Sequence, residues 1–237
     1  MALPKIDVPT YSLTLPSSGK QIRFRPFLVK EEKILLMAGE SDDPADMVEA
    51  LKQVINNCAV ADIDIEKMPT IDIEYFFVQL RSKSVGDKVR ILASHKDSEC
   101  KYQMPVNINL EHVEVVKDEN HTNKIDLGND IGLTLKYPDF AMVQELEKIS
   151  GNDIDKFFEL VTDSIENIWD AENVYEASEH SEEELKEFLE TLNNSAFEKI
   201  QQFYTGLPAL VYKTRYKCKE CGEYEDLELR GLSNFFV

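Results

Sequence analysis

The sequence has few of the residues that mark linker proteins, secreted disulfide-rich proteins or nucleic-acid-binding proteins. Its 237 residues include only nine glycines and nine prolines, which is too few for a low-complexity linker. Its four cysteines are spread thinly and do not form a secreted disulfide framework. Lys and Arg total 26 against 45 Asp and Glu, a formal net charge of −19. Because such a chain repels phosphate backbones and anionic lipid, we expect no nucleic acid and no membrane as partners.

Segments for targeting or for crossing a membrane are also missing. Residues 1–16 contain no cationic stretch followed by an apolar run, so we expect no secretory signal peptide. The apolar stretches are much shorter than the roughly 20 residues that span a bilayer. The sequence therefore favours a cytoplasmic location.

Catalytic motifs are absent as well. The sequence has no G-x-S-x-G, P-loop, G-x-G-x-x-G or H-E-x-x-H pattern. Its four histidines (His95, His112, His121 and His180) lie in polar, charged stretches without a recognised spacing. We therefore predict that the protein is not an enzyme, although a pair of carboxylates assembled from distant positions would leave no motif.

The hydrophobic patterning that is present predicts an α+β fold, mostly helical, with several short antiparallel β-hairpins. Alternating apolar residues around a Pro-Ser-Ser-Gly turn predict a hairpin over 10–27. Helical spacing predicts helices over 29–39, from 43 onward, from 69 onward, and over 140–149, 153–165, 181–192 and 197–204. Strands are expected near 89–93, 106–116, 131–135, 210–216 and 227–229.

A polar, turn-rich stretch at 117–130 is the best boundary between two parts. Residues 1–117 would hold an N-terminal hairpin, three helices and a first knuckle-like hairpin. Residues 118–237 would hold a strand, helices and a C-terminal hairpin that contains a C-x-x-C motif. A weak internal echo, with apolar residues six and eight positions after Cys100 and again after Cys221, would make the two parts pseudo-repeated halves.

The sharpest local motif is Cys218-Lys-Glu-Cys221-Gly222. Two residues between the cysteines let both sulfurs face one ion, and the glycine allows the backbone to bend so that amides can bond to the sulfurs. A thioredoxin-like role fits less well, because strands rather than a helix flank the motif.

Zinc normally takes four ligands, and the motif supplies only two. The echo offers Cys100, with His95 or Asp97 nearby. Our hypothesis is one structural zinc held by Cys218, Cys221, Cys100 and His95, with Asp97 as a substitute for His95. The alternative is a knuckle that holds only reduced cysteines.

Three segments together resemble one family. They are Gly19-Lys-Gln-Ile-Arg-Phe-Arg-Pro-Phe-Leu-Val-Lys-Glu-Glu-Lys33, Asp72-Ile-Glu-Tyr-Phe-Phe-Val-Gln-Leu-Arg-Ser-Lys-Ser-Val-Gly86, and the cysteine knuckle followed by a strand. Over about residues 10–236 the chain resembles the baseplate hub and tail assembly proteins of T4-like bacteriophages.

The resemblance implies a late viral protein without enzymatic activity, which binds other tail or baseplate hub proteins during assembly in the host cytoplasm. Members include hub components and transient assembly factors, so a place in the virion baseplate stays open. The alternative is a zinc-ribbon-like regulator that binds host transcription machinery through Cys218 and Cys221. A local basic patch would then lie near the knuckle, at Lys213, Arg215, Lys217 and Lys219.

Overall fold

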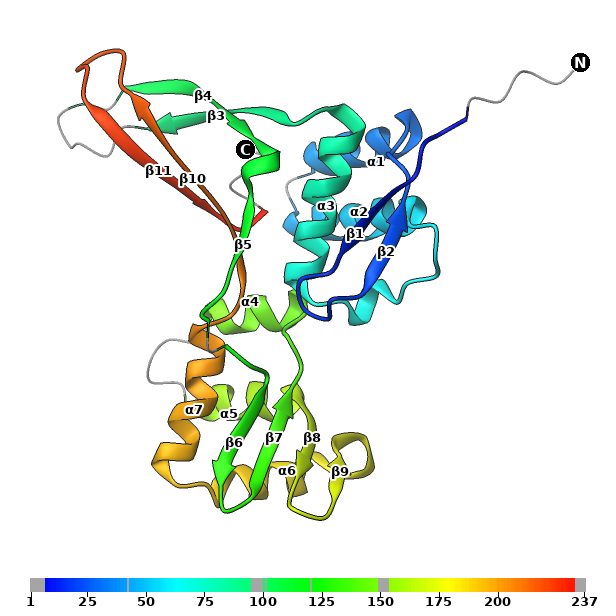
Figure 1. The fold of residues 1–237 in the computed structure, drawn as a ribbon, viewed down its shortest axis with the longest axis vertical. Coiled ribbons are helices and arrows are strands. Elements are labelled where there is room, and N and C mark those ends of the chain that lie inside the picture. Colours follow the sequence, from blue (N-terminus) through cyan, green and yellow to red (C-terminus); the bar gives the residue numbers. More distant parts are fainter. Residues whose placement is uncertain are drawn as a thin grey trace, which may run out of the picture. The chain divides into compact units, whose positions relative to one another are not determined.

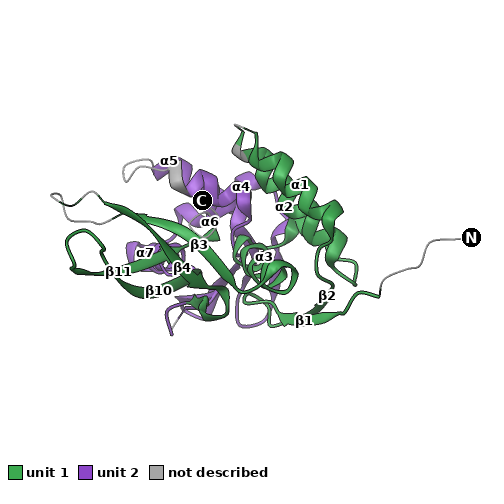
Figure 2. Ribbon diagram, turned by 90° about the horizontal axis from the view of Figure 1, so that it is seen from above, with its two compact units in different colours: residues 1–116, 209–237 green, residues 117–208 purple. Residues whose placement is uncertain are grey.

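The structure, a computed structural model, describes residues 7–41, 43–94, 100, 102–119, 121–148 and 154–232. The chain forms two compact units, shown in green and purple in Figure 2: unit 1 comprises residues 1–116 and 209–237, and unit 2 comprises residues 117–208. Helices and short antiparallel sheets occur in both units (Figure 1), which confirms the predicted α+β class.

Unit 1 begins with the predicted hairpin, in which β1 (Tyr11–Thr14) pairs antiparallel with β2 (Gln21–Phe24). Three helices follow, namely α1 (Val29–Gly39), α2 (Pro44–Cys58) and α3 (Thr70–Val85). The Asp43 side chain accepts a hydrogen bond from the Ala45 backbone N–H at 2.9 Å, and Pro44 occupies the first turn of α2. These two residues start the helix as their types predict.

Helix α3 is the central element of unit 1. Nine of its residues are buried, and they lie around most of the helix circumference rather than on one face. The predicted apolar positions are among them, since Ile73, Phe76 and Leu80 are each at most 1% exposed. Phe76 packs against Phe24 of the hairpin with ring centroids 5.3 Å apart. A helix that is buried on several sides needs neighbours on several sides, and the rest of unit 1 supplies them.

Two longer hairpins complete unit 1. Strand β3 (Lys88–Ser94) pairs with β4 (Gln103–Asn109), and β10 (Ala209–Lys217) pairs with β11 (Tyr224–Arg230). Strand β5 (Glu114–Val116) joins the free edge of β10 to give a three-stranded sheet. Short 3-10 turns, Ile65–Lys67 and Leu110–His112, connect these elements.

The division of the chain differs from the predicted division into 1–117 and 118–237. Unit 2 begins at Lys117, one residue before the predicted boundary, and residues 209–237 group with the N-terminal part. The physical reason is the pairing of β10 with β5, which returns the chain to unit 1. Both hairpins of the sequence echo therefore lie in unit 1, rather than one in each part.

Unit 2 is a four-stranded antiparallel sheet with helices. Its strands are β6 (Lys124–Gly128), β7 (Ile131–Leu135), β8 (Ile165–Trp169) and β9 (Val174–Glu176), in that spatial order. Its helices are α4 (Phe140–Lys148), α5 (Ile154–Ser164), α6 (Glu182–Glu190) and α7 (Asn194–Thr205), with a 3-10 turn at Ala177–Glu179. Asn129 and Asp130 both have positive φ, at 56° and 60°, as the tight turn between β6 and β7 requires.

An apolar core fills unit 2. Its buried members come from the sheet and the helices: Ile125, Leu133, Leu135, Val161, Ile165, Leu185, Leu189, Ile200 and Phe203. The capping box at Ser181 is present as predicted, with the Ser181 side chain accepting from the Glu184 N–H and Glu184 accepting from the Ser181 N–H. Among the described helices, none combines the length and the apolar character that a bilayer crossing requires.

Candidate functional site

The C-x-x-C motif forms a tight knuckle between β10 and β11. The Cys218 N–H donates to the Glu223 carbonyl at 2.8 Å, and the Gly222 N–H donates to the Cys218 carbonyl at 3.1 Å. Gly222 has φ of 77°, a backbone conformation that favours glycine. The predicted role of this glycine in bending the backbone is therefore visible in the knuckle geometry.

Cys100, which is 118 positions away in the sequence, lies beside this knuckle. The Cys100 and Cys218 sulfurs are 3.8 Å apart, and the sulfurs of Cys100, Cys218 and Cys221 all lie within 4.8 Å of one another. All are free thiols, since 3.8 Å far exceeds the roughly 2.05 Å of a disulfide bond. The structure thus brings together the three cysteines that the sequence grouped.

Two tyrosines of β10 fix the hairpins against each other. The Tyr216 hydroxyl donates to the Ser94 carbonyl at 3.2 Å, at the end of β3 that leads toward Cys100. The Tyr212 hydroxyl accepts from the Asn109 N–H at 3.4 Å, at the far end of β4. Both tyrosines are buried, and burial raises the pKa of Tyr216, so its hydroxyl keeps the proton that it donates. These contacts explain why the two hairpins converge at the cysteines.

The spacing of the sulfurs suits a tetrahedral metal ion. With Zn–S bonds of roughly 2.3 Å, a regular tetrahedron separates its sulfurs by about 3.8 Å, and the Cys100–Cys218 distance has this value. Cys218 is buried and Cys221 is exposed. His95 and Asp97, the predicted sources of a fourth ligand, lie outside the described residues.

Hydrogen bonds shift the acidity of the two knuckle thiols in opposite directions. Backbone N–H groups of Cys221 and Glu220 point at the Cys218 sulfur and lower its pKa, against the effect of burial. The Glu223 N–H acts to lower the pKa of Cys221, but partial desolvation of this exposed thiol and the sulfurs of Cys218 and Cys100 raise the pKa overall. Amides directed at a sulfur stabilise the thiolate, which is the form that binds a metal.

Two basic residues of β10 are paired with acidic residues of β11. Lys213 lies directly opposite Glu228 in the strand register and pairs with it at 3.3 Å, and Arg215 lies opposite Asp226 at 3.6 Å. Arg215 also lies over the Tyr224 ring, 5.1 Å from its centroid. Two of the four residues of the suspected basic patch are therefore matched by acids, which weakens the case for a nucleic-acid surface here.

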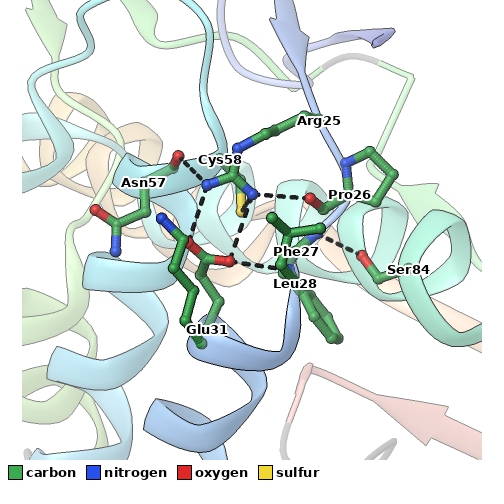
Figure 3. Close-up of polar contacts among 9 residues, drawn as sticks. Arg25, Pro26, Phe27, Leu28, Glu31, Asn57, Cys58 and Ser84 are labelled. Atoms are coloured by element: carbon green, nitrogen blue, oxygen red, sulfur yellow. Dashed lines mark hydrogen bonds and ion pairs between the residues drawn. The ribbon is translucent and has the colours of Figure 1, made fainter. Parts of the chain in front are cut away.

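The segments that carried the family resemblance form a polar junction in unit 1 (Figure 3). Arg25 makes a bidentate ion pair with Glu31, with nitrogen–oxygen distances of 2.9 and 3.4 Å. Glu31 also accepts from the Leu28 N–H at 2.9 Å and so caps the start of α1. Arg25 donates further to the Asn57 carbonyl at 2.9 Å. The junction ties the hairpin to α1 and to the end of α2.

The second resembling segment joins the same junction. The Ser84 hydroxyl of α3 accepts from the Phe27 N–H at 2.9 Å. At the other end of α3, the buried Asp72 accepts hydrogen bonds from the Ser17 N–H, at 2.9 Å, and from the Ser17 hydroxyl. These hydrogen bonds connect α3 to the N-terminal hairpin and to the start of α1, and so hold unit 1 together.

Sequence reasoning missed a cleft in unit 2. It has a volume of about 630 Å³ and is lined by His121, Lys124, Lys199 and Phe203 among others. His121, which the sequence places in polar surroundings, stacks on Phe203 with centroids 5.2 Å apart, and burial lowers its pKa. Its buried Nε2 has no hydrogen-bond partner.

Comparison with known proteins identifies the family of the chain. A family model described as T4 bacteriophage base plate protein matches residues 8–237, nearly the whole chain. The chain belongs to this family of bacteriophage baseplate proteins. No curated protein and no solved structure gives a significant match.

Proposed function

We propose that the protein is a non-enzymatic baseplate hub or tail assembly protein, which binds other tail proteins while the baseplate is built. The family match over residues 8–237 carries this proposal. The chemistry of the described residues agrees with it. The only cluster of three or more potential metal ligands found among them is the group Cys100, Cys218 and Cys221, and a ligand set rich in cysteine is typical of structural zinc sites.

Co-expression with the hub and tape-measure proteins of the same phage tests the proposal. We expect the chain to co-purify with at least one of them and not with an unrelated protein of similar size. Failure to retain any protein of that set would contradict the assembly role. Baseplate intermediates from cells that lack the gene distinguish this role from transcription control, because only an assembly protein leaves the hub incomplete while transcription stays normal.

We further propose that Cys100, Cys218 and Cys221 hold one structural zinc ion, with His95 as the fourth ligand and Asp97 as its substitute. The 3.8 Å separation of two sulfurs and the amides directed at Cys218 support this. The ion would clasp the β3–β4 and β10–β11 hairpins at their tips. Its role would be structural, because three thiolates and a fourth protein ligand leave no open position for substrate.

Metal analysis of protein purified without chelator tests the zinc site. We expect one zinc per chain in the wild type, and less than half an equivalent in Cys218→Ser. Cys58→Ala is the matched control, because Cys58 is a buried thiol in unit 1 outside the cluster, and this variant should keep its zinc. A wild-type protein with less than half an equivalent would contradict the proposal.

A further inference from the structure

One face of unit 2 combines an apolar pocket with a concentration of acidic side chains. The pocket has a volume of about 300 Å³. Its apolar lining comes from three elements: Ile131 of β7, Ile168 and Trp169 of β8, and Leu185 and Phe188 of α6. Asp170, Tyr175, His180 and Glu184 complete the lining. These side chains present an apolar floor with polar and charged groups at its edge.

A close contact between Gly132 and Trp169 fixes one wall of the pocket. Gly132 lies opposite Trp169 in the strand register, and a Cβ on Gly132 would be 2.0 Å from Cζ2 of the Trp169 ring. The indole therefore lies over the glycine, in space that any other residue would fill. Such a prearranged aromatic wall loses little conformational entropy when a ligand binds.

The turn beside the pocket is equally well fixed. Asp170 accepts hydrogen bonds from the backbone N–H groups of Glu172 and Asn173, each at 2.8 Å, and from the Tyr175 hydroxyl at 2.9 Å. These bonds lower the pKa of Asp170, so it carries a negative charge at neutral pH. Ile131 and Tyr175 remain 38% and 41% exposed, which leaves apolar surface for a partner to cover.

Most of the charged residues in the stretch around the pocket are acidic. The stretch 166–190 contains one lysine, Lys186, and no arginine. Its acidic residues are Glu166, Asp170, Glu172, Glu176, Glu179, Glu182, Glu183, Glu184, Glu187 and Glu190. Within the described part of the chain, neither Asp170 nor Glu184 pairs with a lysine or arginine, and Glu184 lies 3.6 Å from His180. The negative charge at the pocket edge is therefore available to a partner.

We propose that this face docks a basic segment of another tail protein, which places an apolar side chain in the pocket and its lysines or arginines on the acidic rim. The inference rests on the proposed function, because it names the chemistry of the partner that the assembly role requires. A nucleic acid or an anionic membrane does not fit, because the same carboxylates would repel it. An apolar anchor within a charged rim is the usual arrangement of a protein–protein hot spot.

Trp169 provides a direct assay, because it is the only tryptophan of the chain and lines the pocket. The probes are three tryptophan-free synthetic peptides: a leucine pair flanked by lysines, the same pair flanked by glutamates, and a serine pair flanked by lysines. We expect only the first to change Trp169 emission saturably, and we expect this binding to weaken as salt increases. Equal responses to all three peptides, or no response to the first, would overturn the proposal.

Two pairs of variants locate the effect. Ile131→Lys removes apolar surface from the pocket and introduces a positive charge, which repels the positively charged peptide. Leu92→Lys makes the same change at an exposed residue of unit 1. Glu184→Gln removes a rim charge but keeps an amide that can cap α6, and Glu111→Gln is its control in unit 1. We expect Ile131→Lys to weaken binding of the leucine–lysine peptide at least ~10-fold, Glu184→Gln to weaken it several-fold, and both controls to leave it unchanged.

Failure of this inference is distinguishable from failure of the proposed function. If tail proteins co-purify equally well with the wild type and with Ile131→Lys, the docking face is refuted while the assembly role stands. If no tail protein co-purifies with the wild type, the assembly role itself fails. Retention by the wild type and by Leu92→Lys, with loss in Ile131→Lys, supports both.

Discussion

The two units of this protein are built from the chain in different ways. Unit 2 is one continuous stretch of chain around an apolar core. Unit 1 joins the two ends of the sequence and connects them through specific polar links. These include Leu232 to Glu74, separated by 158 positions, and the cysteine cluster, separated by 118. Closing such long loops costs chain entropy, so unit 1 needs these long-range contacts in addition to its apolar core around α3.

The two units also differ in where their polar groups point, and this difference indicates different roles. In unit 1 the polar groups are turned inward, on one another, at the Arg25–Glu31 junction and at the cysteine cluster. In unit 2 the acidic groups around the apolar pocket face outward. We infer that unit 1 is a framework and that unit 2 presents a binding face. Variants that affect one unit and spare the other test this division.

The largest expected effect is a cavity in the core of unit 2. Leu133 is fully buried, and Leu133→Ala should cost about 2–5 kcal/mol of unfolding free energy, because the neighbouring side chains cannot refill the space. Urea denaturation followed by Trp169 fluorescence measures it, since this tryptophan lies in unit 2. Leu92→Ala, at a residue 70% exposed, is the control and should leave the transition in place. A loss under about 1 kcal/mol for Leu133→Ala would argue against a well-packed core.

A slightly smaller effect is expected at the junction of unit 1. Burial alone would raise the pKa of Glu31, but hydrogen bonds from Arg25, the Leu28 N–H and Lys30 outweigh it and lower the pKa to about 2. Glu31→Gln removes the charge and should cost roughly 3 kcal/mol at neutral pH. Urea denaturation followed by circular dichroism, compared with the exposed Glu32→Gln, measures this loss. The Trp169 transition should not move; a parallel shift would show that the units do not unfold independently.

Acid tests the same ion pair without a mutation. Because the folded-state pKa of Glu31 lies below its ordinary value of 4.5, its contribution is complete above pH 4.5 and is lost as the pH falls toward 2. We expect the stability difference between the wild type and Glu31→Gln to shrink over this window, as measured by urea midpoints at a series of pH values. A difference that stays constant down to pH 2 would mean that the pair does not supply the stabilisation.

The smallest effect is expected at a helix start in unit 2. Ser181→Ala removes the side-chain acceptor for the Glu184 N–H and should cost about 1 kcal/mol, seen as a lower midpoint in the Trp169 transition. Ser178→Ala, at an exposed serine three residues earlier, provides the comparison. Equal midpoints for the two variants would show that the capping box contributes nothing to α6.

Much of the local structure could be predicted from the sequence, because short-range rules determine it. The start of α2 at Asp43-Pro44 and the capping box at Ser181 follow from side chains that bond to nearby backbone groups. The strand β8, by contrast, was not predicted. It follows directly on the amphipathic helix α5 and leads into an acidic stretch. The apolar residues Ile168 and Trp169 are too few, beside so many charges, to form a recognisable strand pattern.

Some features of the candidate sites could likewise be predicted from the sequence, and others appear only in the folded chain. The knuckle at Cys218 was visible in the sequence because its two cysteines and Gly222 lie within five consecutive residues. The sequence echo also grouped Cys100 with this knuckle, but the hydrogen bonds of the Tyr212 and Tyr216 hydroxyls that connect the two hairpins have no local sequence pattern. The pocket around Trp169 combines two strands and a helix that meet only in the folded unit. The Trp169 ring occupies space that a side chain at position 132 would fill, and no sequence pattern shows this contact.

Amide hydrogen exchange with and without a zinc chelator compares the proposed zinc site of unit 1 with the apolar core of unit 2. We predict that chelation releases zinc and reduces protection in β3, β4, β10 and β11, while β7, β8 and α7 keep theirs. Unchanged protection in both units after zinc release, or equal loss in both, would show that zinc does not hold the two hairpins of unit 1 together.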